Sequence, residues 1–86
     1  MYRYFFTPLA LKQIKKLPKD TRKRIIKKLD HYCRKNFFSY ADHVVDPRLG
    51  EYRFRIGDYR VIFDKESEDS ILILKIGHRR EIYRKR

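Results

Sequence analysis

The chain has 86 residues, a length that favours one domain spanning residues 1–86 with a modest core. It is 42% apolar and 15% aromatic, which argues against wholesale disorder. The 23 Lys and Arg residues outnumber the 11 Asp and Glu residues and give a net charge of +12. Such an excess of positive charge predicts that the partner is a nucleic acid or another polyanion.

The cysteine count and the apolar runs indicate the compartment. Cys33 is the only cysteine, so no intramolecular disulfide can form, and we expect a reducing environment. The first eight residues are too short and too broken for a signal peptide, and no apolar run approaches the roughly 20 residues of a membrane helix. We therefore expect a cytoplasmic protein with no membrane partner.

The first half of the chain predicts a strand and two helices. Residues 2–6 are aromatic-rich and read as a strand. Thr7 and Pro8 then suit the N-cap and first position of a helix, which Pro18 ends. Residues 18–35 form a second helix, whose apolar stripe comprises Ile25, Ile26, Leu29, Tyr32 and Cys33. Because almost no loop separates the helices, we expect an antiparallel hairpin.

Residues 36–49 show no readable period. Their aromatic residues, Phe37, Phe38 and Tyr40, are expected to anchor a loop to the core rather than to stack bases. His31 and His43 lack partners at metal-ligand spacing, so we expect no metal site and no cofactor.

From residue 50 the apolar period changes to two, which indicates strands. Residues 51–56 and 59–64 flank Gly57-Asp58, a pair that suits a type II′ hairpin turn. Residues 71–76 form a third strand, and the tail from 77 to 86 is either a short helix or an extended piece. The predicted fold class is α+β: an N-terminal strand, an antiparallel helix hairpin, and a three-stranded antiparallel meander with a short C-terminal tail.

The predicted hairpin gathers arginines on one face. A two-residue turn sets Arg55 opposite Arg60, with Arg53 on the same face, while the aromatic and aliphatic residues form the opposite, core face. Like charges directly opposed are destabilising, so this arrangement predicts a bound anion such as phosphate. Alternatively, the arginines point into water or pair with the nearby acidic residues Glu51, Asp58 and Asp64.

The arginine face should also carry apolar residues of the third strand. They are either Ile71 and Ile73, or Leu72, Leu74 and Ile76. Their exposure predicts that the tail folds over them through Ile82. That packing would bring four further side chains of the tail near the arginines, namely those of His78, Arg79, Arg80 and Tyr83.

Three segments resemble the RelE branch of the RelE/ParE toxin superfamily. They are LPKD at 17–20, LGEYRFRIGDYRVIFD at 49–64 and IGHRREIY at 76–83, so the similarity covers nearly the whole chain. The resemblance implies a microbial-ribonuclease-like RelE fold. It also implies a toxin of a type II toxin–antitoxin system that cleaves mRNA in the ribosomal A site and is inhibited by a cognate acidic, RelB-like antitoxin.

The resemblance assigns roles to particular residues. The family's catalytic positions fall on Arg53, Arg55, Arg60, Arg79 and Tyr83. Further contacts with RNA are expected from His78, Arg80, Glu51, Lys27 and Lys28. The implied chemistry is metal-independent attack of the ribose 2′-hydroxyl on the scissile phosphate, with arginines stabilising the added negative charge.

The sequence departs from the family at the general base. Well-known bacterial members carry lysines where this chain has Arg53 and Arg55, and arginine cannot act as a base. Some relatives use a glutamate and a histidine, so Glu51 and His78 are candidates for proton transfer. Two alternative functions remain open: a ParE-like inhibitor of DNA gyrase and a non-catalytic basic RNA-binding module.

Overall fold

The computed structural model describes residues 1–83, and the last three residues of the predicted tail lie outside the described part. Within it, the sheet has the order β1-β5-β4-β3-β2. The strands are β1 (Arg3–Phe6), β2 (Ala41–His43), β3 (Tyr52–Ile56), β4 (Tyr59–Ser67) and β5 (Ser70–His78). The helices are α1 (Pro8–Lys15), α2 (Lys19–Arg34) and a short 3₁₀ turn, η1 (Phe37–Ser39). The predicted α+β fold is confirmed.

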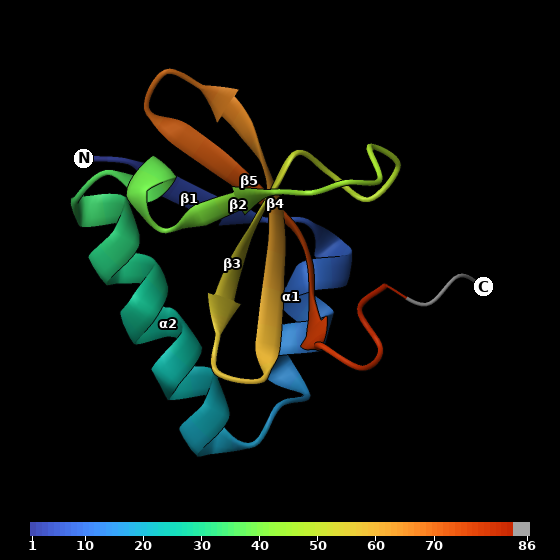
Figure 1. Ribbon diagram of the computed structural model, residues 1–86. Helices are drawn as coiled ribbons and strands as arrows, with labels where there is room; N and C mark the ends of the chain where they lie inside the picture. Colours follow the sequence, from blue (N-terminus) through green and yellow to red (C-terminus); the bar gives the residue numbers. More distant parts are fainter. Residues whose placement is uncertain (84–86) are drawn as a thin grey trace.

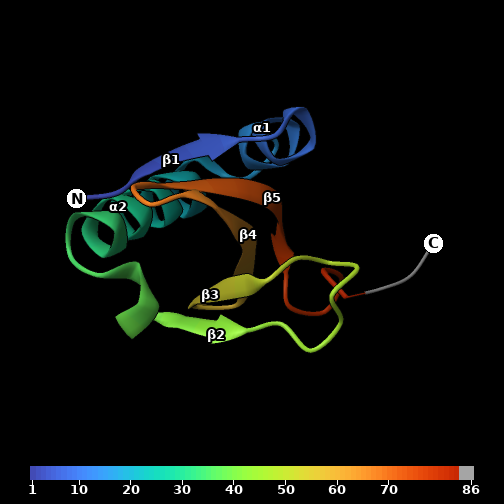
Figure 2. The same cartoon turned by 90° about the horizontal axis from the view of Figure 1, so that it is seen from above.

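Both helices cover one face of a strongly curved sheet, as the view from above shows (Figure 2). Thr7 is the N-cap of α1, because its side chain accepts a hydrogen bond from the Ala10 amide, and Pro8 occupies the first turn as expected. The helices run in opposite directions but diverge from their short connection (Figure 1). They thereby cover different parts of the sheet.

The core lies between the helices and the sheet. It includes Ile25 and Leu29 of α2, Phe54 of β3 and Phe63 of β4, all with no exposed surface. Cys33 is 2% exposed and belongs to this core, as predicted from the α2 stripe.

The loop aromatics divide between the core and the surface. Phe37 is fully buried and makes an edge contact with Tyr2, whereas Phe38 is 43% exposed and lies against Phe37. The Tyr40 ring stacks on Tyr32 of α2. These contacts confirm that the segment after α2 is anchored to the core.

The meander has one strand more than predicted, because β2 pairs antiparallel with β3. The three residues of β2, Ala-Asp-His, are too few and too mixed in polarity to show a period of two. The first strand, β1, pairs in parallel with β5 and not with a sequence neighbour.

The hairpin register is the predicted one. Arg55 lies opposite Arg60, and Arg53 lies opposite Ile62. Gly57 has φ +59, and no non-glycine residue in the described part has a positive φ. A positive φ at the first central residue alone fits the predicted type II′ turn.

A β-bulge changes which residues of β5 face the core. Lys75 pairs with Ile62, but the next pair joins Ile73 to Phe63, so Leu74 is an extra residue in β5. Ile71, Ile73 and Ile76 therefore all lie in the core. Neither of the two predicted sets of β5 residues was complete, because both assumed that side chains alternate between the two sheet faces along the whole strand.

The tail folds over the arginine face through Ile82, as predicted. Ile82 is 1% exposed, although it lies outside the main core, and its carbonyl accepts a hydrogen bond from Lys75 Nζ at 3.1 Å. A Cβ on Gly77 would lie 3.2 Å from Ile82 Cδ1, so the glycine lets the tail approach the sheet closely. The amides of Glu81 and Ile82 both donate to the His78 carbonyl, which makes this segment a single turn.

Candidate functional site

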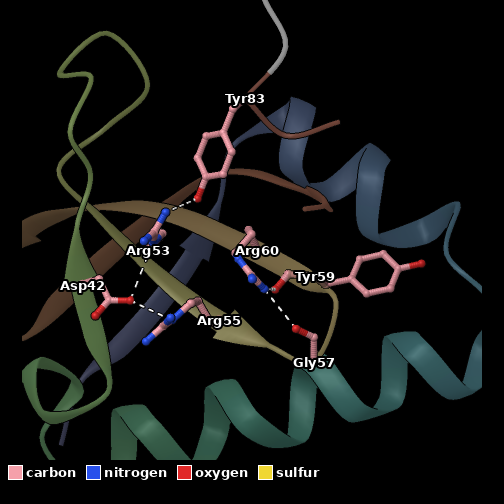
Figure 3. A network of polar contacts seen from close by, with 7 residues as sticks. All are labelled: Asp42, Arg53, Arg55, Gly57, Tyr59, Arg60 and Tyr83. Atoms are coloured by element: carbon pink, nitrogen blue, oxygen red, sulfur yellow. Dashed lines mark hydrogen bonds and ion pairs between the residues drawn. The ribbon is translucent and has the colours of Figure 1, made fainter. Parts of the chain in front are cut away.

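The site is a patch on the sheet face opposite the helices, and we call it the arginine patch. It comprises Arg53 and Arg55 of β3, Arg60 of β4 and Tyr83 of the tail (Figure 3). The three arginines share this face because β3 and β4 keep the register of a two-residue turn, which directs alternate side chains to the same side. The packing of Ile82 brings Tyr83 to the same place.

Arg53 joins the sheet to the tail. Its Nη1 donates a hydrogen bond of 2.6 Å to the Tyr83 hydroxyl, and its Cζ lies 5.7 Å from the centroid of the Tyr83 ring. The sequence-predicted tyrosine therefore contacts a sequence-predicted arginine from a different part of the chain.

Arg55 and Arg60 are cross-strand partners in the hairpin, but their side chains contact different groups. Arg55 Nε lies 2.9 Å from Asp42 Oδ2 on β2. Arg60 Nη1 donates to the carbonyls of Gly57 and Tyr59, at 3.0 and 2.9 Å. These separate partners offset the repulsion expected between opposed like charges.

Arg79 lies beside the hairpin turn. Its amide donates to the Asp58 carbonyl at 2.7 Å, and its Nε lies 3.8 Å from Asp58 Oδ1. Asp58 is thus the one residue of the predicted acidic set that forms an ion pair with an arginine in residues 1–83. Because Arg60 bonds to the carbonyl of the adjacent Gly57, both arginines lie near the same turn.

The other two acidic residues of the predicted set hold the backbone instead. Glu51 Oε1 accepts from the Lys65 amide, and Asp64 Oδ1 accepts from the Glu51 amide. The Glu51 carboxylate therefore connects the start of β3 to β4. It accepts its hydrogen bond from the β4 backbone and not from an arginine of the patch.

His78 is not brought to the arginine patch. It pairs with Tyr59 in the sheet and its ring lies 5.5 Å from the Tyr59 ring, on the face that carries the core residues Ile76 and Val61. The prediction failed because the bulge at Leu74 sets which of the last β5 residues face the helices. Arg80 is exposed in the turn after β5, where its amide donates to His78 Nδ1.

Lys27 and Lys28 are exposed on α2. The helix α2 covers the core face of the sheet, whereas the arginine patch lies on the other face (Figure 2).

Asp42 contacts the arginine patch, and the sequence did not indicate it. Asp42 could be predicted only by recognising β2. The pairing of β2 with β3 sets Asp42 opposite Arg53 and directs its side chain to the arginine face. No group of three or more His, Cys, Asp or Glu side chains in residues 1–83 is arranged to hold a metal ion.

Comparison with protein families identifies the class. Residues 4–83 match the family described as the ParE toxin of type II toxin–antitoxin systems, parDE. The chain therefore belongs to the RelE/ParE superfamily of type II toxin–antitoxin toxins. A comparison with curated proteins found no match.

Solved structures of similar fold come from toxin–antitoxin complexes. A chain of the RelBE2 complex from Mycobacterium tuberculosis is 20% identical, with a TM-score of 0.79, and the match covers 90% of this chain and 96% of that chain. The E. coli RelBE complex gives 21% identity and a TM-score of 0.73, covering 91% and 96%. The archaeal RelE–RelB complex from Pyrococcus horikoshii gives 26% and 0.69, covering 93% and 97%. These likenesses confirm the RelE-type fold.

No helix in residues 1–83 is both long enough and apolar enough to cross a membrane.

Proposed function

We propose that this toxin is an mRNA endonuclease that acts on the ribosome, in the cytoplasm, without a metal or cofactor. The observation that carries the proposal is the arginine patch, in which three guanidinium groups from two strands and a tyrosine from the tail share one surface. Guanidinium groups bind phosphate through paired hydrogen bonds, so this surface suits one phosphodiester linkage.

The proposed reaction is an internal transfer within the RNA. The ribose 2′-oxygen forms a bond to the adjacent phosphorus, the bond to the 5′-oxygen breaks, and the 2′-proton is lost while the leaving oxygen gains one. The products are a 2′,3′-cyclic phosphate and a 5′-hydroxyl end. Arg53, Arg55, Arg60 and Arg79 stabilise the extra negative charge of the transition state, which is often the largest catalytic contribution.

Tyr83 is proposed to hold the unpaired base by stacking or to assist a proton transfer. Arg80, Lys27 and Lys28 are proposed to contact RNA phosphates. Because the Glu51 carboxylate bonds to the backbone and His78 lies on the other face, neither is placed to exchange protons at the arginine patch.

The openness of the patch supports the proposed dependence on the ribosome. Arg55 is exposed and Tyr83 is 37% exposed, so the surface does not enclose a substrate. In-line attack requires tight alignment of the 2′-oxygen, phosphorus and leaving oxygen. A ribosome that holds the message in its A site supplies this alignment.

The test is cleavage of a defined mRNA on purified, programmed ribosomes, with both new RNA ends mapped. We expect Arg60→Ala to lower the single-turnover rate by about 100-fold, as for loss of one stabilising donor. Arg3→Ala removes an exposed arginine of β1 and should cleave like wild type. A message with a 2′-deoxy nucleotide at the cleaved position should be resistant. Cleavage of that message, or full activity of Arg60→Ala, would contradict the mechanism.

Inhibition of DNA gyrase is the second candidate, because the matching family is described by ParE toxins. A gyrase supercoiling assay separates the two functions. Inhibition of supercoiling without any ribosomal cleavage would favour this candidate. The third candidate, a non-catalytic RNA-binding module, predicts salt-sensitive RNA binding with no cleavage products at any protein concentration.

We also propose an acidic, RelB-like antitoxin as the protein partner. The similar solved structures are complexes of RelE with RelB. This chain is strongly basic and exposes apolar residues near its β1–α1 edge, where Phe5 is 50% and Leu9 is 51% exposed. An amphipathic helix with acidic residues would complement both properties.

A further inference from the structure

One carboxylate lies against two arginines of the patch. Asp42 Oδ2 is 2.9 Å from Arg55 Nε and 3.7 Å from Arg53 Nε (Figure 3). Asp42 pairs with Arg53 across the β2–β3 register, so the backbone of an edge strand fixes its position. The same oxygen atom therefore serves guanidinium groups two residues apart on β3.

These ion pairs do little for the stability of the fold. The Asp42 side chain is 39% exposed, and the Arg55 side chain is 60% exposed. Pairs this accessible to water contribute little to the free energy of unfolding. Their effect is therefore on where the guanidinium groups point.

The contacts use the inner nitrogen of each arginine. Asp42 lies against the Nε atoms, whereas Arg53 Nη1 donates its hydrogen bond to Tyr83. Arg53 Nε is buried and has no hydrogen-bond partner within residues 1–83, so the nearby Asp42 charge is what compensates that donor. Asp42 also draws Arg55 toward β2, away from the opposed Arg60.

We propose that Asp42 is a positioning residue for RNA cleavage. This inference rests on the proposed endonuclease function. Asp42 holds Arg53 and Arg55 so that their terminal nitrogens meet one phosphate, while its own negative charge opposes the approach of RNA. Binding and cleavage should consequently respond in opposite directions when the charge is removed.

The test is Asp42→Asn, which keeps the size of the side chain and removes its charge. We expect a Kd for a short single-stranded RNA that is about threefold lower, because one repulsive charge near the phosphate is removed. We expect single-turnover cleavage on the ribosome to slow by about tenfold, because small displacements of aligned groups are costly. Asp42→Glu restores the charge on a longer arm and should recover part of the rate.

Glu66→Gln is the matched control, since it removes one exposed negative charge from the far end of β4. It should leave the rate of cleavage unchanged. If Asp42→Asn cleaves as fast as wild type, or loses both binding and cleavage together with thermal stability, the positioning role is wrong.

A readout without RNA cleavage separates this inference from the proposed function. In wild-type protein, the Nε–H proton of Arg55 should exchange slowly with water and give a distinct NMR signal, because Arg55 Nε is held in an ion pair with Asp42. Asp42→Asn should accelerate that exchange, and Glu66→Gln should not. Equal exchange in all three proteins would overturn the positioning by Asp42. Absence of cleavage by wild type with the exchange difference intact would count against the endonuclease function alone.

Discussion

At the residue scale, the arginine patch is organised by a different partner for each guanidinium group. Tyr83 holds Arg53, Asp42 holds Arg55, and two turn carbonyls hold Arg60. Like charges repel at close range, and the separate partners offset that repulsion. The partners therefore fix where each guanidinium group lies within the patch.

The Tyr83 hydroxyl can be tested apart from its ring. Tyr83→Phe removes the acceptor for Arg53 Nη1 and leaves the aromatic surface. We expect cleavage about fivefold to tenfold slower, which corresponds to the loss of about 1 kcal/mol from one hydrogen bond. Single-turnover kinetics on programmed ribosomes measures this. A rate equal to wild type would assign Tyr83 to stacking alone, and Tyr83→Ala would then be the variant that loses activity.

Cys33 gives a second prediction at this scale. Burial raises the pKa of the thiol to about 11, and the nearby Asp30 carboxylate adds to the effect. The folded state thus keeps the thiol proton at a pH where the unfolded chain has lost it. The free energy of unfolding should fall as pH rises from the ordinary thiol range to about 11.

The measurement is urea denaturation of wild type and Cys33→Ala from pH 8 to 11. The difference in stability between the two proteins should shrink toward the upper end of that range. A constant difference would show that the thiol titrates alike in both states.

At the scale of the elements, the β3–β4 hairpin decides whether a patch exists. A slip of one residue would move the arginines to the core face. Gly57 prevents this slip because its φ of +59 suits a two-residue turn, and a Cβ there would lie 3.1 Å from Arg24 Nη2 on α2.

Gly57→Ala should destabilise the protein by about 1–2 kcal/mol, the cost of a left-handed backbone for an alanine. Asp58→Ala, at the next position, should cost less than about 0.5 kcal/mol, because it removes only an exposed ion pair. Urea denaturation of both variants is the measurement. Equal losses of stability would argue against strain at Gly57.

The sequence predicted the elements that depend on local signals. The Thr7-Pro8 cap, the α2 stripe and the Gly57-Asp58 turn each act within a few residues, and together they indicated the fold and three of the arginines. The missed features depend on tertiary packing. The three residues of β2 have no period of their own, and the bulge at Leu74 is visible only in the pairing of β4 with β5. Asp42 was missed because it lies on β2, and the sheet face of His78 was missed because it depends on the bulge.

At the scale of the whole molecule, the positive charge has two locations. The arginine patch lies on one face of the sheet, and Lys27 and Lys28 lie on α2 across the other. A net charge of +12 favours RNA in general, whereas only the patch is proposed to perform chemistry.

The double variant Lys27→Ala/Lys28→Ala separates these contributions. We expect weaker RNA binding and a shallower salt dependence, with the slope falling by about one for each phosphate that the protein no longer neutralises. The single-turnover rate at saturating protein should stay at the wild-type value. Binding measured at several salt concentrations tests this, and an unchanged slope would place both lysines away from RNA.

The parallel pairing of β1 with β5 has a consequence for how the protein is made. Arg3 lies beside Ser70 and Phe6 beside Ile73, so β1 meets its partner only after both helices and the other strands have been translated. Contacts that distant in sequence form late, after the entropy of closing a long loop has been overcome. Until β5 is synthesised, the nascent chain has no completed sheet, and Tyr83 cannot yet join the arginine patch.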